Sequence, residues 1–148
     1  MEPKITLLDT IHQTFDLDRR DINTYSPLTL AYLGDAVYEI IIRTLIVEGK
    51  EGAVNTLHRR SSKLVNAGAQ ATIFNAIESQ LLEEELAVYR RGRNAKSHSV
   101  AKNASIHDYR MATGFEALMG YLYLIGDMNR AIALVRQGLT NSDLLSFL

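Results

Sequence analysis

The chain has 148 residues, of which 47% are apolar and 22% are charged, and its formal net charge is −1. This composition is that of a folded globular protein, and the length is enough for one domain with its own hydrophobic core. Cysteine is absent, which excludes disulfide bonds and thiolate chemistry and fits a reducing compartment, so we expect a cytoplasmic location. The near-neutral charge excludes nucleic-acid binding through a general excess of positive charge.

Neither a targeting signal nor a membrane span is predicted. The N-terminus, MEPKITLLDTIHQTF, lacks the basic region, apolar core and small-residue cleavage site of a secretory signal. The stretch between Asp21 and Glu39 contains Pro27, Asp35 and several polar groups, and it falls short of a membrane span. We therefore expect a protein that works without a membrane.

The apolar residues are spaced as in helices along almost the whole chain, and no segment alternates as a half-buried strand would. Two of the predicted helices, over residues 26–47 and 108–125, are apolar around most of their circumference, which is typical of central helices. The sequence therefore predicts an all-α fold, a single-domain helical bundle around these two buried helices. The remaining helices are predicted over residues 5–15, 53–66, 67–77, 81–91 and 128–138.

Capping residues indicate where several of these helices begin and end. Ser26 can cap the second helix, and Pro27 suits its first position, where no amide hydrogen is needed. Gly49 and Gly52 provide the turn after that helix, and Gly92 is expected to end the fifth helix. The segment that follows, GRNAKSHSVAKNASI, is rich in Gly, Asn, Ser and Lys and is predicted to be a loop.

Asp35 and Glu116 stand out because each is an isolated charge in a long apolar helical run. An ionised carboxylate in such a place is costly, so it is normally neutralised, paired with a cation or bound to a metal. Two such residues in one small domain suggest that they share a partner. The pattern is typical of a metal-dependent enzyme.

Structural roles are the alternative for both residues. Asp35 follows Gly34 and could cap a helix, although a capping box would need Glu or Gln where Tyr38 stands. Glu116 could accept a hydrogen bond from a nearby hydroxyl group or form an ion pair. The candidate partners for these contacts are Tyr109, Thr113, Tyr121 and Arg110.

Three separate segments, arranged along the chain in the order that the family has, resemble a known enzyme family. LAYLGDAVYE (residues 30–39) and FEALMGYLYL (residues 115–124) are similar to the two signature helices of the ribonuclease III endonuclease domain. RRGRNAKS (residues 90–97) resembles the short branch called Mini-ribonuclease III. The similarity covers about residues 28–138 and implies a ribonuclease III-type endonuclease domain.

Two departures from the larger family are visible. Ala31 and Thr113 stand where a full-length ribonuclease III has further carboxylates, which agrees with the Mini branch and removes half of the usual cluster. The resemblance implies a catalytic domain over residues 25–148, with the N-terminal helix and link over residues 1–24 outside the match. No double-stranded-RNA-binding domain follows in this sequence, so we expect the catalytic domain and other partners to hold the substrate.

The resemblance implies a magnesium-dependent endoribonuclease that cleaves double-stranded RNA, with Asp35 and Glu116 as catalytic residues and metal ligands. Magnesium prefers oxygen ligands and keeps several waters, so one Asp and one Glu are enough to anchor it, and Mn²⁺ could take its place. Weak metal binding is expected without RNA. Glu39 and Thr113 could lie around these ligands, although an ion pair with Arg43 is the simpler expectation for Glu39.

A basic segment follows an acidic one. Residues 78–85 carry four acidic side chains, whereas residues 90–107 carry five Arg and Lys side chains and no acid. Such a segment can contact phosphates and ribose hydroxyls, as proteins that recognise the shape of A-form RNA do, although a solvated charged segment is the alternative. The predicted RNA-binding residues are Arg90, Arg91, Arg93, Asn94 and Lys96.

The cleavage of both strands of a duplex needs two carboxylate pairs related by a two-fold axis. The resembled family is a homodimer, and Leu30, Tyr32 and Leu33 on the first signature helix are candidate interface residues. Within the resembled branch the substrate is a duplex in precursor large-subunit (23S) ribosomal RNA, whose ends are matured, and a ribosomal protein could assist.

Two other functions compete with this one. His58, His107, Asp108 and Asp127 follow the order found in histidine-aspartate phosphohydrolases, whose histidine ligands would favour transition metals. A non-catalytic RNA-binding or scaffold protein with the same fold is the second alternative, and the carboxylates missing at positions 31 and 113 suggest it. Retention of both remaining acids argues against a scaffold, because an idle domain could have replaced them with apolar residues.

Overall fold

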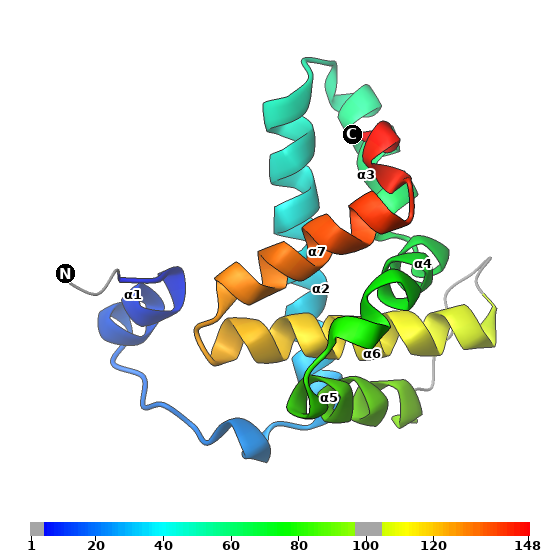
Figure 1. The fold of residues 1–148 in the computed structure, drawn as a ribbon. Helices are drawn as coiled ribbons and strands as arrows, with labels where there is room; N and C mark the ends of the chain where they lie inside the picture. The colour runs from blue at the N-terminus through cyan, green and yellow to red at the C-terminus, as the bar shows by residue number, and fades with distance from the viewer. Residues whose placement is uncertain (1–4, 97–104) are drawn as a thin grey trace.

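Helix α6 (Ile106–Leu124) runs through the middle of the molecule and is crossed by the longer helix α2 (Pro27–Gly49), as Figure 1 shows. The computed structural model describes residues 5–96 and 105–148, and every regular element within those ranges is helical, which confirms the predicted all-α fold. No helix in these two ranges is long and apolar enough to cross a membrane. The other elements are α1 (Leu7–Thr14), α3 (Val54–Val65), α4 (Ala67–Ile77), α5 (Glu83–Asn94), α7 (Met128–Asn141) and the short 3₁₀ helices η1 (Ile22–Thr24), η2 (Glu78–Gln80) and η3 (Leu144–Phe147).

Helix α6 supplies the centre of the hydrophobic core. Between Met111 and Leu122, all residues except Glu116 and Tyr121 are buried. The helix packs against α2, α4, α5 and α7. A helix with neighbours on so many sides has little solvent-facing surface, which explains why its sequence is apolar around most of its circumference.

Helix α2 is buried along one side only, whereas its sequence predicts a helix buried all round. Leu30 and Tyr38 are 2% and 0% exposed, but Tyr32 and Ile40 on the outer side are 84% and 60% exposed. The prediction of Leu30 as an exposed interface residue is therefore wrong, and Leu33 is partly buried against the core. The open apolar side of α2 is a candidate contact surface.

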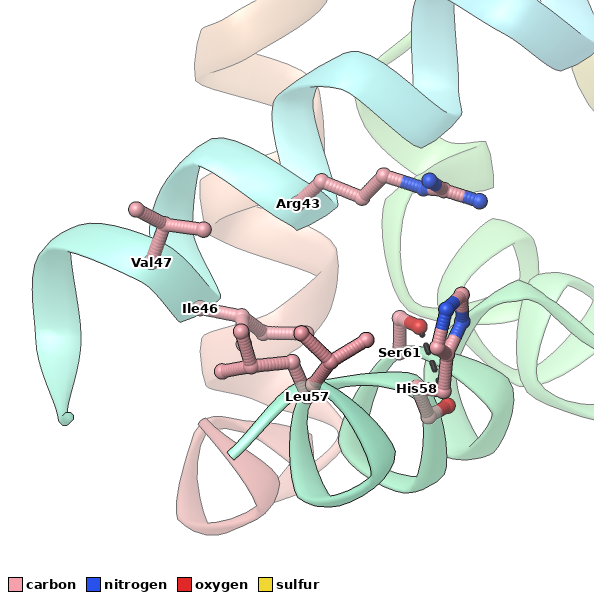
Figure 2. Close-up of a pocket in the computed structure, with 7 residues that line it drawn as sticks. Arg43, Ile46, Val47, Leu57, His58 and Ser61 are labelled. Atoms are coloured by element: carbon pink, nitrogen blue, oxygen red, sulfur yellow. Dashed lines mark hydrogen bonds between the residues drawn. The ribbon is translucent and has the colours of Figure 1, made fainter. Parts of the chain in front are cut away.

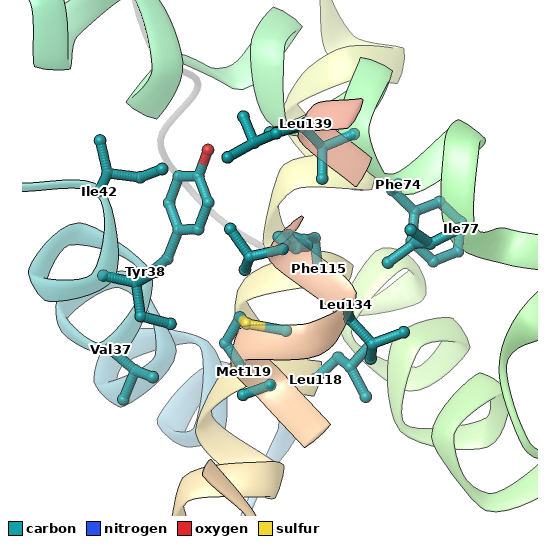
Figure 3. Packing of buried hydrophobic residues seen from close by; sticks show 14 of the residues in the cluster. Val37, Tyr38, Ile42, Phe74, Ile77, Phe115, Leu118, Met119, Leu134 and Leu139 are labelled. Atoms are coloured by element: carbon teal, nitrogen blue, oxygen red, sulfur yellow. The ribbon is translucent and has the colours of Figure 1, made fainter. Parts of the chain in front are cut away.

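Aromatic side chains join the helices in the core (Figure 3). The Tyr38 ring on α2 meets the Phe115 ring on α6 edge to face, with their centroids 5.3 Å apart. The Phe74 ring on α4 stacks on the Tyr89 ring of α5 at a centroid distance of 3.6 Å. The Tyr38 hydroxyl also donates a hydrogen bond to the Leu64 carbonyl of α3, which satisfies a polar group that burial would otherwise leave unpaired.

Glycine at the crossing of α2 and α6 lets the two backbones touch. A Cβ atom on Gly34 would lie 1.6 Å from the carbonyl oxygen of Glu116, and one on Gly120 would lie 2.1 Å from that of Leu30. Both distances are far below van der Waals contact, so neither position has room for a side chain. The two helices consequently cross where Asp35 and Glu116 lie.

Gly92 has a different role from the predicted one. The sequence suggests that it ends the fifth helix, but α5 continues through it to Asn94. A Cβ atom on Gly92 would lie 2.8 Å from the Ala117 Cβ atom and 2.9 Å from the Gly114 Cα atom of α6. This glycine is therefore needed for close packing between α5 and α6, which a local rule for helix ends does not detect.

Other predicted boundaries agree with the structure to within a few residues. Ser26 caps α2 by accepting a hydrogen bond from the Thr29 amide at 3.1 Å, and Pro27 lies in the first turn. Helix α4 spans the predicted residues. Helix α1 forms as predicted, but Leu8 is the one residue that it buries.

Candidate active site

The helix crossing brings Asp35 and Glu116 together, although they are far apart in the sequence. Asp35 is exposed on α2 next to Gly34, and Glu116 is partly buried on α6. The two carboxyl groups are close enough to interact through charge and hydrogen bonding. A helix-capping role for Asp35 is excluded, because the residue lies in the interior of α2.

The surroundings of Glu116 disfavour its ionised form. Burial, followed by the charge of Asp35, raises the pKa of Glu116 to about 8, and Glu39 acts in the same direction. A hydrogen bond from Gln70 lowers this pKa without offsetting the other effects. Near neutral pH the pair therefore holds a proton, which a bound cation would displace.

Gln70 is a site residue that the sequence reasoning missed. It lies on α4, is almost fully buried, and places its side-chain nitrogen 3.4 Å from Oε2 of Glu116. The sequence suggests hydroxyl groups and Arg110 as partners of Glu116, and Gln70 is not among these candidates. The available signal was a lone amide in the otherwise small and apolar run AGAQATIF, but only the fold shows that this run meets α6.

The two residues expected around the carboxylate pair have other main contacts. Glu39 forms the predicted ion pair with Arg43, with a nitrogen to oxygen distance of 2.9 Å. Its effect on the pKa of Glu116 nevertheless places its charge near the pair. Thr113 is buried one turn before Glu116 and donates a hydrogen bond to the Tyr109 carbonyl at 3.0 Å.

The chemistry of this site suits a hard divalent cation. No group of three or more His, Asp or Glu side chains is placed to hold a metal within residues 5–96 and 105–148. Magnesium does not need such a cage, because one or two carboxylates suffice when water and substrate phosphate complete its shell. Asp35 and Glu116 offer oxygen ligands, and the Gln70 amide oxygen near them is buried without a hydrogen-bond partner, so the residues present fit magnesium or manganese.

The residues of the phosphohydrolase alternative are not brought together. Asp127 caps α7 by accepting a hydrogen bond from the Arg130 amide at 3.1 Å. His58 lies on α3, whereas His107 and Asp108 begin α6. Since the described residues contain no metal-binding group of three, this alternative has no support from the structure.

The predicted RNA-binding residues cluster at the end of α5. Arg91 donates to the Tyr25 carbonyl at 3.4 Å, and Arg93 lies over the Tyr89 ring at 5.7 Å. Arg90, Asn94 and Lys96 are exposed. The predicted loop begins at Gly92, but α5 continues to Asn94. Residues 97–104 of the predicted loop, including Lys102, lie outside the described residues.

A cleft lies between α2 and α3, beyond Glu39 along α2 (Figure 2). Arg43 and His58 lie on the same side of it, and Ile46 and Leu57 supply apolar walls. None of its lining residues is a carboxylate. Arg43 is already paired with Glu39, so the cleft adds neither a free cation nor a carboxylate ligand for a metal ion.

Comparisons with known proteins were consistent with one another. The chain matches the Ribonuclease III domain family over residues 28–127, a range that includes both carboxylates and begins after α1. It is 51% identical over 116 residues to a Clostridium tetani protein named Mini-ribonuclease 3, covering 78% of this chain and 77% of that protein. A Thermoanaerobacter protein of the same name is 46% identical over 125 residues, covering 84% and 88%.

A solved structure gives the same result for the fold. The X-ray structure of a Fusobacterium nucleatum protein is similar to this one with a TM-score of 0.71 and 31% sequence identity. The match covers 79% of this chain and 93% of that one.

Proposed function

Because the chain belongs to the ribonuclease III family, in its Mini-ribonuclease III branch, we propose that it cleaves double-stranded RNA with the help of magnesium held by Asp35 and Glu116. Membership of the family makes the protein an endoribonuclease. The observation that supports the assignment of the site is the pair itself. Two carboxylates from different helices lie together at a backbone crossing, where burial and then the charge of Asp35 raise the pKa of Glu116.

The catalytic roles follow from the chemistry of these side chains. Asp35 and Glu116 would hold Mg²⁺, which when bound polarises the scissile phosphodiester and favours ionisation of the attacking water. Glu116 releases its proton as the site fills, because a bound cation favours the ionised carboxylate. Glu39 is held by Arg43, so its role is to orient water near the site rather than to be a ligand.

The end of α5 is proposed to contact the RNA backbone. Gly92 packs against Ala117, the residue after Glu116. The basic residues on either side of Gly92 therefore lie beside the same turn of α6 as Glu116. Phosphate contacts of this kind position a duplex without reading its sequence. The double variant Arg90→Ala with Lys96→Ala is expected to bind duplex RNA more weakly than the control Arg136→Ala, which removes an exposed cation from α7. Comparison of the two affinities tests this contact.

The purified protein is expected to cut end-labelled double-stranded RNA in Mg²⁺ and to leave it intact in EDTA. The single strands of the same sequence and a DNA duplex serve as controls and should be cut far more slowly. Transfer from EDTA to Mn²⁺ should restore cutting, because the site offers oxygen ligands that both ions accept. Binding without cutting in Mg²⁺ and in Mn²⁺ would contradict the proposal and favour the non-catalytic scaffold.

A homodimer is proposed, with the open side of α2 as its interface. Tyr32, Ile40 and Val47 lie along one face of this helix and are 84%, 60% and 62% exposed. Apolar side chains this exposed along one helix face are typical of an interaction site. Asp35 lies at the border of the same face, so a two-fold axis there would place two carboxylate pairs close enough together to act on both strands of one duplex.

The Ile40→Glu variant is expected to shift the protein from dimer to monomer and to slow duplex cleavage. Burial of an unpaired charge at an apolar interface opposes association. Sedimentation equilibrium measures the change, and Ile132→Glu on α7, where Ile132 is 48% exposed, is the matched control. A wild-type protein that is monomeric at the concentrations where it cleaves would contradict the proposed dimer.

The biological substrate is proposed to be a duplex in precursor large-subunit (23S) ribosomal RNA, cut in the cytoplasm to mature its ends. The membership of the Mini-ribonuclease III branch supports this proposal, and a ribosomal protein is a candidate helper. We also propose that residues 25–148 form the catalytic domain. Mapping the ends of 23S RNA in cells without the protein tests the substrate, since normal ends would exclude it.

A further inference from the structure

The Gln70 side chain is a buried amide whose nitrogen has hydrogen-bond partners and whose oxygen has none among the described residues. It lies in the first turns of α4, and 2% of the residue is exposed. Nε2 donates a hydrogen bond to the Val65 carbonyl at 3.0 Å and lies 3.4 Å from Oε2 of Glu116. Oε1 is buried and has no hydrogen-bond partner among the described residues.

The neighbours of Nε2 fix the orientation of this amide. The Val65 carbonyl can only accept a hydrogen bond, so the amide nitrogen of Gln70 must face it. The flipped amide would place Oε1 against this carbonyl oxygen. Oε1 is therefore left to accept a hydrogen bond from a group that residues 5–96 and 105–148 do not supply.

A buried amide oxygen without a donor is rare in folded proteins, because its loss of hydration is unfavourable. In this protein the amide belongs to the side chain that contacts a proposed metal ligand. Magnesium keeps several waters when it binds to one or two carboxylates, and such waters are hydrogen-bond donors. Asp35 and Glu116 themselves offer only acceptors when they are ionised.

We propose that Gln70 is a positioning residue of the cation site, in which Nε2 holds the Glu116 carboxylate and Oε1 accepts a hydrogen bond from a water that hydrates the bound cation. A primary amide suits both tasks because it carries a donor and an acceptor on one planar group. The inference rests on the metal-dependent cleavage proposed above and adds a residue that orients both a ligand and the hydration of the cation.

The test compares two replacements of Gln70. Gln70→Met keeps the length and unbranched shape of the side chain and removes its hydrogen-bonding groups, whereas Gln70→Glu keeps an acceptor and removes the donor. Mn²⁺ binding to the free protein is followed by electron paramagnetic resonance of the unbound ion. The Mg²⁺ dependence of duplex cleavage and the melting temperature in EDTA are measured on the same samples.

Gln70→Met is expected to weaken Mn²⁺ binding, and to raise the Mg²⁺ concentration for half-maximal cleavage, by about 10- to 100-fold. Gln70→Glu is expected to bind Mn²⁺ at least as tightly as the wild type, because its added charge attracts the cation. Its metal-free form should melt at a lower temperature, since a third carboxylate then lies beside Glu116. A purely structural role predicts the opposite order for metal binding, with Gln70→Glu as the weaker variant.

Gln137→Met on α7 is the matched control and should bind Mn²⁺ as the wild type does. An unchanged Mn²⁺ affinity in Gln70→Met would overturn the inference, and so would equal losses in both Gln70 variants. If Gln70→Met does not fold, weaker Mn²⁺ binding by Gln70→Glu than by the wild type would overturn it. Absence of cleavage by the wild type would instead overturn the proposed function, whereas the Mn²⁺ measurement would still report on Gln70.

Discussion

The Glu116→Gln variant is expected to lose duplex cleavage and to be more stable than the wild-type protein in the absence of metal. The replacement keeps the size of the side chain and its contact with Gln70, but it removes a charge needed to hold the cation. Residues that only orient metal ligands contribute about 10- to 100-fold, so loss of the ligand itself should slow cleavage by more than about 100-fold. Single-turnover cleavage in Mg²⁺ measures this effect.

The gain in stability follows from the pKa of Glu116. Burial and then the charge of Asp35 raise this pKa from 4.5 to about 8 in the folded protein. The folded state therefore binds the proton more tightly than the unfolded state, which stabilises the protein fully below pH 4.5. This contribution is lost as the pH rises through about 8. Glu116→Gln lacks the titrating group and should escape this loss.

Thermal unfolding in EDTA measures the difference. We expect the melting temperature of Glu116→Gln to exceed that of the wild type by at least about 3 °C at a pH near 8, with a smaller difference at a pH near 5. Addition of Mg²⁺ should reduce the difference, since it stabilises the wild type alone. Glu48→Gln, an exposed acid on α2, is the control and should change neither property. Wild-type cleavage by Glu116→Gln would remove the proposed mechanism.

The Gly34→Ala variant is expected to be severely destabilised and inactive. Its Cβ atom would lie 1.6 Å from the Glu116 carbonyl oxygen and 2.7 Å from the Gly120 amide nitrogen. Both are backbone atoms of α6, so no side-chain rotation relieves the clash and the two helices must move apart. Overpacking of this kind costs about 3 kcal/mol, the upper end of the usual range, because a backbone must move, and the separation would also pull Asp35 away from Glu116. Urea unfolding followed by circular dichroism measures the loss.

Gly68→Ala on α4 is the matched control for this change. A Cβ atom there would have its nearest neighbour, the Asn66 Oδ1 atom, at 3.4 Å, which is an ordinary contact. Because Ala favours a helix over Gly by about 0.5 to 1 kcal/mol, this variant should be at least as stable as the wild type. A Gly34→Ala protein with wild-type stability would show that the α2–α6 crossing can widen without cost.

Local patterns in the sequence were sufficient for the fold class and for most helix positions. The 3.6-residue period, the Ser26 and Pro27 start of α2, and the span of α4 depend on interactions within a few residues of one another, so they can be read without knowing the fold. The isolated charges of Asp35 and Glu116 were also visible, because an uncompensated carboxylate in an apolar run is unusual wherever the run packs.

Contacts between distant segments could not be predicted in this way. Gly92 looks like a helix end, yet it is a packing glycine because α6 leaves no room for a side chain. Ile40 looks like a core residue, yet it lies on an open face that no other part of the described chain covers. Gln70 looks unremarkable among small residues until α4 is placed beside Glu116.

The sequence by itself therefore determined an all-helical protein with two unusual carboxylates. The tertiary structure decided that these carboxylates meet, since Gly34 and Gly120 allow two backbones to touch at that point. It also placed Gln70 of α4 against Glu116, and Gly92 of α5 against Ala117, the residue after Glu116. The reason is physical, because helix formation depends on neighbouring residues, whereas the properties of a site depend on burial, charge and close packing between residues far apart in the chain.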